Sequence, residues 1–262
     1  MLLGRRRLGR LLRRVLFSLL LLTAVLLAFK DRFVNHLVPA SLQEADSLLW
    51  VIAHPDDESF FFAPAILNLL HGPKRGALLC LSIGDHDGMG PTRREELKRS
   101  CARLGIEADR CEALDSLELP DNPGVWWPAP VIEREVLQRV KDWGIDTIFT
   151  FDGYGVSGHA NHRATAVAIR EMVRRAAMPP VYAVHSTSVV AKFTSVLLLP
   201  WAVIRHVLAA DSERKALFIN TWSQYGRALD SFRAHESQAR WFRTLFIYFS
   251  RYMWYIRADR VS

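Results

Sequence analysis

From residue 47 onward, short apolar runs alternate with stretches in which apolar side chains recur at helical spacing. Three of the runs have the length and composition of buried strands: 48–53, 76–82 and 146–151. Helical spacing predicts helices over 58–70, 92–104, 131–143 and 161–175. Because strands that alternate with helices form parallel sheets covered by helices, we expect an α/β sandwich with a mainly parallel sheet.

Local signals set some of the predicted boundaries. Pro64 is expected to delay or kink the first helix, because proline lacks a backbone N–H and clashes with the preceding turn. The run Thr92-Arg-Arg-Glu95 has the pattern of a capping box, so it predicts the start of the second helix. Gly105 then predicts the end of that helix.

The N-terminal pattern is different. Residues 1–14 contain six arginines and no acidic residue, and residues 15–29 carry no charge. The uncharged run alone spans about 22 Å, less than a hydrocarbon core of roughly 30 Å, but a helix that starts at Leu11 is long enough for a thin bilayer. The sequence therefore predicts a basic segment over 1–14, a single transmembrane anchor over 15–33 and a globular domain over 46–255.

A cleaved signal peptide is the alternative to an anchor. A basic start followed by a short apolar run fits both, but Ala28-Phe-Lys-Asp-Arg32 lacks the small-residue cleavage pattern, which favours the anchor. The excess of arginines before the apolar run would place the N-terminus in the cytosol and the globular domain in the lumen.

Charge and cysteine usage exclude some classes of function. Subtracting the six N-terminal arginines from the net charge of +7 leaves +1 for the rest of the chain, so no basic surface for nucleic acid is expected. Cys80, Cys101 and Cys111 form no Cys-x-x-Cys pair, so a cysteine metal site is not expected. We expect them to be buried free thiols in a reducing compartment.

Chemistry-bearing residues follow two of the predicted strands. His54-Pro-Asp-Asp-Glu58 comes after the first, and a glycine-rich loop ending in His159-Ala-Asn-His162 comes after the strand at 146–151. Ligands in open α/β sheets bind beyond the carboxyl ends of the strands, so we expect these two loops to meet in one crevice.

Histidine and carboxylate are suitable ligands for a catalytic divalent metal, most plausibly Zn²⁺. We assign His54, Asp57 and His162 as ligands. Asp56, beside them but not ligating, is the candidate general base for a water activated by the metal. His159 is the candidate to stabilise the oxyanion or to protonate the departing amine.

The motifs resemble a known family. Ala53-His-Pro-Asp-Asp-Glu58 with Gly158-His-Ala-Asn-His162 is similar to the LmbE-like zinc deacetylases. Matches at 120–124, 150–159 and 241–253 are similar to the N-acetylglucosaminyl-phosphatidylinositol de-N-acetylases of the PIG-L type. The resemblance covers about residues 46–255.

The resemblance implies a Rossmann-like three-layer sandwich and a hydrolase. The reaction it implies converts GlcNAc-phosphatidylinositol to glucosaminyl-phosphatidylinositol and acetate, the second step of GPI-anchor biosynthesis. It implies the same metal and base residues as the assignment above. It also implies a protein of the endoplasmic reticulum membrane whose catalytic domain faces the cytosol, against the charge rule, and we adopt this orientation.

Further residues are candidates for the same site. Arg93, Glu58 and Asn161 are candidate substrate contacts, although a solvent-facing Arg93 is equally compatible with the sequence. The loop Asp85-His86-Asp87 departs from the family pattern, and we expect it to face solvent or substrate rather than a second metal. The role of His235 stays open.

Two apolar stretches near the C-terminus have alternative interpretations. Residues 193–204 are too few to span a bilayer, and the run is either a surface that enters the membrane or a core strand with its neighbours. The aromatic run 241–255 is either an interfacial segment or, more plausibly, an amphipathic core helix. The competing functions are deacetylation of another GlcNAc conjugate and a non-catalytic membrane adaptor with the same fold.

Overall fold

The computed structural model describes residues 2–32, 34–175, 178–209 and 212–262. Its centre is a seven-stranded sheet in the order β3-β2-β1-β4-β5-β7-β6. The strands are β1 (Ser47–Ile52), β2 (Arg75–Cys80), β3 (Cys111–Ala113), β4 (Thr147–Phe151), β5 (Val181–Val184), β6 (Lys215–Ile219) and β7 (Tyr255–Arg260). The strands from β3 to β5 pair in parallel, and β7 is antiparallel to both β5 and β6. The expected mainly parallel sheet is therefore confirmed, with an antiparallel edge that includes β7, past the predicted end of the domain at residue 255.

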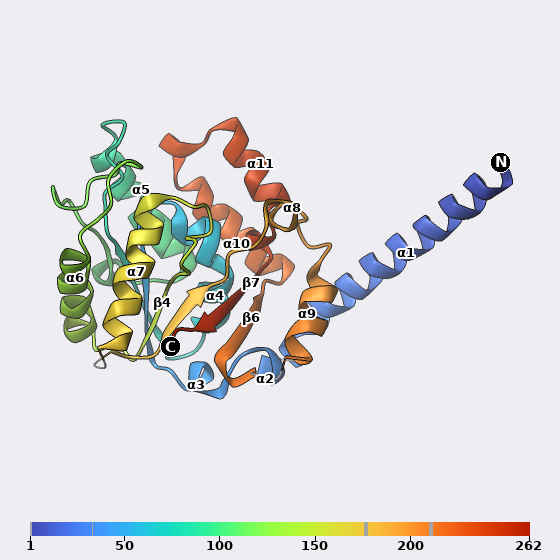
Figure 1. The fold of residues 1–262 in the computed structure, drawn as a ribbon, viewed down its shortest axis with the longest axis horizontal. Helices are drawn as coiled ribbons and strands as arrows, with labels where there is room; N and C mark the ends of the chain where they lie inside the picture. Colours follow the sequence, from blue (N-terminus) through green and yellow to red (C-terminus); the bar gives the residue numbers. More distant parts are fainter. Residues whose placement is uncertain (1, 33, 176–177, 210–211) are drawn as a thin grey trace.

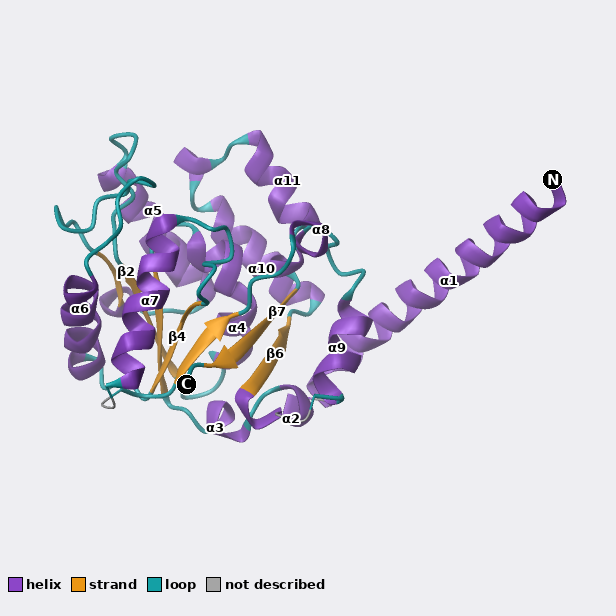
Figure 2. Ribbon diagram, in the orientation of Figure 1, coloured by secondary structure: helices purple, strands orange, loops and turns teal. Residues whose placement is uncertain are grey.

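Helices cover both faces of the sheet. The described α-helices are α1 (Leu2–Phe29), α2 (Val34–Leu37), α3 (Ala40–Gln43), α4 (Ala63–Leu69), α5 (Gly90–Leu104), α6 (Ala129–Asp142), α7 (Ala160–Arg174), α8 (Val189–Lys192), α9 (Leu199–Val207), α10 (Trp222–Arg233) and α11 (Trp241–Phe249). In Figure 1, α7 crosses in front of β4 with α6 beside it, whereas α4, α5 and α10 contact one another behind the sheet. Figure 2 shows the resulting three layers of helix, strand and helix. The Rossmann-like three-layer sandwich is confirmed.

The helix that precedes β2 begins with an unusual turn. Residues Glu58–Phe62 form a single π-helical turn, and α4 follows with Pro64 in its first turn. Proline fits there because the first N–H groups of a helix have no intrahelical partner. The α-helix therefore begins at Ala63 instead of residue 58, in agreement with the delay predicted from Pro64.

The predicted capping box at Thr92 is wrong. Helix α5 begins at Gly90, two residues earlier, with Pro91 in its first turn. The carboxylate of Asp85 accepts a hydrogen bond from the backbone N–H of Gly90 at 2.6 Å. Asp85 therefore satisfies a free N–H of the first turn, which is the role predicted for Thr92. The C-terminal prediction is confirmed, since Gly105 ends α5 in the left-handed conformation at φ 92°.

The expectation of three free cysteines is also wrong. Cys101 near the end of α5 and Cys111 at the start of β3 form a disulfide, while Cys80 is free and buried. The packing of α5 against β3 brings the pair together. Because this contact depends on the tertiary fold, the spacing of the cysteines in the sequence does not indicate it.

Helix α1 extends away from the domain (Figure 1). Residues Gly9–Arg32 have the length and hydropathy of a membrane span, with only 12% of the apolar window buried in the protein. The C-terminal end of this segment is hydrogen-bonded to the domain. The ammonium group of Lys30 donates to Asn68 at 2.5 Å and to Gln224 at 2.7 Å. The predicted apolar helix is therefore present, and most of its surface is exposed.

The stretch 193–204 is not a core strand. Its second half belongs to α9, a helix that packs against α1 and β6 and leaves Trp201 and Ile204 exposed. The structure contradicts the core-strand alternative, because this stretch forms turns and a helix on the surface of the domain.

Candidate active site

The two predicted loops meet. Strands β1 and β4 are parallel neighbours, so their carboxyl ends lie at the same edge of the sheet. This brings residues 54–58 against residues 152–162. Nε2 of His162 lies 3.3 Å from a carboxylate oxygen of Asp57 and 3.3 Å from Nδ1 of His54. The third edge of the triangle runs from Nδ1 of His54 to the other carboxylate oxygen of Asp57, at 3.9 Å.

These three side chains fit a tetrahedral metal. In a zinc site with bonds of about 2.0–2.1 Å, neighbouring ligand atoms lie about 3.3 Å apart. Burial would raise the pKa of Asp57, but His162 and His54 beside it lower the pKa well below its ordinary value. Asp57 is thus a carboxylate, the form that binds a metal.

His159 joins the same cluster. One nitrogen each from His54, His159 and His162 lie within 4.8 Å of one another, the one such group found among the described residues. Burial and the neighbouring His54 and His162 lower the pKa of His159 to about 4, so its ring is neutral at neutral pH. Nδ1 of His159 accepts the backbone N–H of Asn161 at 3.3 Å, which assigns the proton to Nε2. His159 therefore presents a neutral N–H donor.

Asp121 and Asn161 fix the orientation of the His54 ring. Its Nε2 lies 3.2 Å from Oδ1 of Asp121 and 3.1 Å from Oδ1 of Asn161, so Nδ1 is left to face Asp57 and His162. Carboxylates in this position orient a histidine ligand and raise its basicity. Although burial acts in the opposite direction, the hydrogen bond and charge of His54 lower the pKa of Asp121 to about 2.

Asp121 is a functional residue that was not predicted from its type and spacing, although it lies within the motif 120–124 on which the family resemblance partly rests.

The three candidate substrate contacts have different surroundings. Arg93 lines the cavity and donates to Asp121, to Gly84 O and to Pro55 O, so it is not a solvent-facing charge. Asn161 is fully buried and contacts His54 and the carbonyl of Val125 instead of the cavity. Glu58 is also fully buried.

Asp56 lies beside the ligands in a strained backbone conformation. Its φ is 123°, a region that costs a non-glycine residue about 1–3 kcal/mol and that clusters at functional sites. Its carboxylate is buried and forms an ion pair with Arg243 on α11. Burial raises the pKa of Asp56, and the charge of Arg243 opposes the rise.

A closed ring of hydrogen bonds supports Asp56. Glu58 accepts the backbone N–H of Asp56 with one oxygen at 3.0 Å, and its other oxygen lies 2.6 Å from Nε2 of His235. Nδ1 of His235 contacts Gln238 at 3.1 Å, and Gln238 accepts from Arg243 at 2.8 Å. Arg243 completes the ring by donating to Asp56. His235 and Glu58 thus hold the candidate base in place.

A cavity of about 630 Å³ opens over the cluster. Its polar floor carries the metal-binding triangle, Asp56 and His159, and its wall contains Phe60, Phe61, Phe193 and Phe246. His86 and Asp87 lie at the rim and form no metal-binding group among the residues described here. A polar floor beneath an aromatic wall suits a substrate with a sugar head and an apolar part.

The chain is similar in sequence to known proteins. Residues 49–173 match the family described as PIG-L, GlcNAc-PI de-N-acetylase. The chain is 38% identical over 208 residues to the N-acetylglucosaminyl-phosphatidylinositol de-N-acetylase of Bos taurus, covering 78% of this chain and 79% of that one. The chain belongs to the PIG-L family. It is also 32% identical over 213 residues to a protein of Schizosaccharomyces pombe named as a probable N-acetylglucosaminyl-phosphatidylinositol de-N-acetylase, with 79% of this chain and 84% of that one covered.

The PIG-L fold also has relatives of known structure. The N,N'-diacetylchitobiose deacetylase of Pyrococcus horikoshii superposes with a TM-score of 0.56 at 15% identity, covering 78% of this chain and 77% of that one. At this identity the match shows the shared fold alone.

Proposed function

We propose that this protein hydrolyses the acetamide of GlcNAc-phosphatidylinositol to give glucosaminyl-phosphatidylinositol and acetate, the second step of GPI-anchor biosynthesis. The observation that carries the proposal is the triangle of His54, Asp57 and His162 beneath a large cavity, with Asp56 beside it. Membership of the PIG-L family supports the substrate.

The three ligand residues would hold a divalent metal, for which we propose Zn²⁺. When bound there, the metal would polarise the acetamide carbonyl and make water more acidic. Asp56 accepts a proton from the attacking water and passes it to the amine as the C–N bond breaks. The Nε2–H of His159 donates to the oxygen on which negative charge develops. The hydrogen-bonded ring behind Asp56 fixes the direction in which its carboxylate points.

We further propose that α1 anchors the protein in the endoplasmic reticulum membrane by a single span. The family resemblance supports a catalytic domain that faces the cytosol. The N-terminal arginines favour the opposite orientation. Three free thiols would have indicated the reducing cytosol, but Cys101 and Cys111 form a disulfide, so the cysteines do not support the cytosolic orientation. Accessibility of an engineered glycosylation site in the exposed loop at Leu117 decides between the two orientations.

The direct test is acetate release by the purified full chain from GlcNAc-phosphatidylinositol and from a soluble GlcNAc–inositol conjugate. We expect the lipid to be the better substrate, with activity lost on chelation and restored by Zn²⁺. Asp56→Asn should abolish activity, while Asp142→Asn on the exposed end of α6 serves as the matched control. A preference for the soluble conjugate would identify another GlcNAc derivative as the substrate. No activity from a folded, metal-loaded chain would favour the adaptor alternative.

A further inference from the structure

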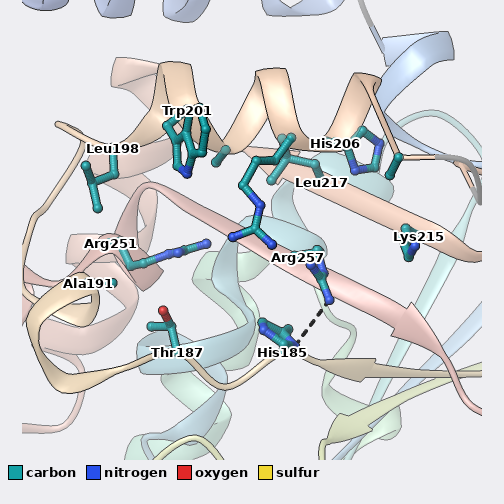
Figure 3. Close-up of a pocket in the computed structure, with 13 residues that line it drawn as sticks. His185, Thr187, Ala191, Leu198, Trp201, His206, Lys215, Leu217, Arg251 and Arg257 are labelled. Atoms are coloured by element: carbon teal, nitrogen blue, oxygen red, sulfur yellow. Dashed lines mark hydrogen bonds between the residues drawn. The ribbon is translucent and has the colours of Figure 1, made fainter.

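A second cavity, of about 320 Å³, lies between α9, the loop that follows β5 and the strand β7 (Figure 3). None of its lining residues lines the catalytic cavity. The two cavities come close to each other at α8, where Ala191 lines the second cavity and Phe193, directly after the helix, lines the catalytic one. The proposed deacetylation makes no use of this space.

Positive charge is concentrated around the second cavity. Arg205, Lys215, Arg251 and Arg257 all line it. Arg257 is paired with Asp259 at 2.5 Å, whereas no carboxylate among the described residues lies within 4.0 Å of the side-chain nitrogens of the other three. Clustered cations with a single neutralising partner produce a positive potential that favours an anion.

Two buried donors in the wall lack good acceptors. Nε of Arg251 is buried without a hydrogen bond, and its guanidinium group stacks on the ring of Tyr255 at 4.3 Å. His206 is only 4% exposed, and neither ring nitrogen makes a hydrogen bond of normal geometry, although the backbone of His36 lies close enough to influence it. Buried polar atoms without partners call for an explanation, such as a ligand that accepts from them.

Figure 3 shows how these groups are arranged. His206 lies on α9 above the cavity, Arg251 extends into it from one side, and Arg257 contacts His185 below. Donors that converge from several elements suit a compact anion with several acceptor oxygens, and phosphate has this geometry.

The surroundings indicate where such a phosphate would come from. Helix α9 packs against α1, the candidate membrane span, and lies near its base in Figure 1. Several apolar side chains on α9 and directly after it are exposed, namely Trp201, Ile204, Val207 and Leu208. Tryptophan beside aliphatic residues is typical of the membrane–water interface, where lipid headgroups are located.

We propose that this cavity binds the phosphate of an anionic membrane lipid, at a site separate from the one that binds the acetamide. The membrane origin of the ligand rests on the proposed anchor, whereas the phosphate chemistry rests on the cavity itself. A lipid held here would fix the domain against the bilayer by its α8–α9 side, next to the aromatic wall of the catalytic cavity.

The test is a calorimetric titration of the full chain in neutral detergent micelles with three probes: dioctanoyl phosphatidate, dioctanoylglycerol and inorganic phosphate. The cavity variant is Arg205→Gln/Arg251→Gln. Its matched control is Lys141→Gln/Arg174→Gln, which removes the same charge from exposed positions on α6 and α7, on the opposite side of the domain in Figure 1. Thermal unfolding checks that both variants fold, and Arg205→Gln/Lys215→Gln replaces the cavity variant if loss of the Arg251 stack unfolds it.

We expect the wild type and the control variant to bind phosphatidate more tightly than inorganic phosphate and not to bind dioctanoylglycerol. The cavity variant should bind phosphatidate at least about tenfold more weakly, since two charged donors are lost. Equal affinity for phosphatidate and inorganic phosphate would overturn the lipid assignment in favour of a soluble phosphate. Equal affinity of the cavity and control variants for phosphatidate would overturn the site. Phosphatidate matches the phosphatidyl group of the proposed substrate, so the comparison of the cavity and control variants is what locates its site. The substituted residues do not line the catalytic cavity, so neither result bears on the deacetylase proposal.

Discussion

The buried pair of Glu58 and His235 gives a prediction whose size can be worked out from the structure. Both side chains are completely buried, and they contact each other at 2.6 Å. Replacing His235 with leucine fills much of the same space but leaves the carboxylate of Glu58 buried opposite an apolar group. Removing one partner of a buried pair costs about 3–5 kcal/mol, so His235→Leu should lower the free energy of unfolding by that amount.

Thermal unfolding at a single scan rate measures this effect. A domain of this size loses about 2–4 °C in Tm for each kcal/mol, so we expect a fall of about 6–20 °C. His71→Leu, at an exposed histidine, is the matched control and should leave Tm unchanged. The double variant Glu58→Gln/His235→Leu should lose less stability than the sum of the two single variants, because no buried charge remains. A change in Tm below about 2 °C for His235→Leu, or additive effects in the double variant, would refute this account of the pair.

Three further predictions concern the metal-binding cluster. Asp121→Asn should weaken zinc affinity about 10–100-fold in a competitive chelator titration, because it removes the carboxylate that orients His54. Unchanged zinc affinity would contradict that role. His159→Gln should lower kcat about 10²–10³-fold with little change in KM, and a change confined to KM would indicate a binding residue instead. Gly155→Ala should reduce both metal content and activity, because φ is 71° and an added Cβ would lie 2.6 Å from the Cβ of His162, whereas Gly226→Ala, with open space around it, should not.

The sequence predicted the parts of the site that follow directly from strand order. The loops at 54–58 and 152–162 each come after a strongly apolar run, and parallel neighbours place them at one edge of the sheet. Asn161 and Glu58 lie in the same motifs but are buried behind the site. A motif gives the position of a residue in the chain, whereas the direction of its side chain depends on what packs around it.

Contacts between distant segments could not be predicted in the same way. Arg243 reaches Asp56 from α11, 187 residues later in the chain. The disulfide between Cys101 and Cys111 depends on how α5 packs on β3. The antiparallel strands β6 and β7 form the edge of the sheet after a long helical excursion, and no local pattern indicates that pairing.

The most direct test of the account is to measure the zinc content and the acetate release of the purified chain in two aspartate variants that differ by one position. We expect about one zinc per chain and full activity in the wild type. Asp57→Asn should lose both zinc and activity, because it removes a ligand, whereas Asp56→Asn should retain zinc and lose activity, because it removes only the base. An active Asp56→Asn variant, or zinc retained at the wild-type level by Asp57→Asn, would contradict the assignment of the metal centre and its base.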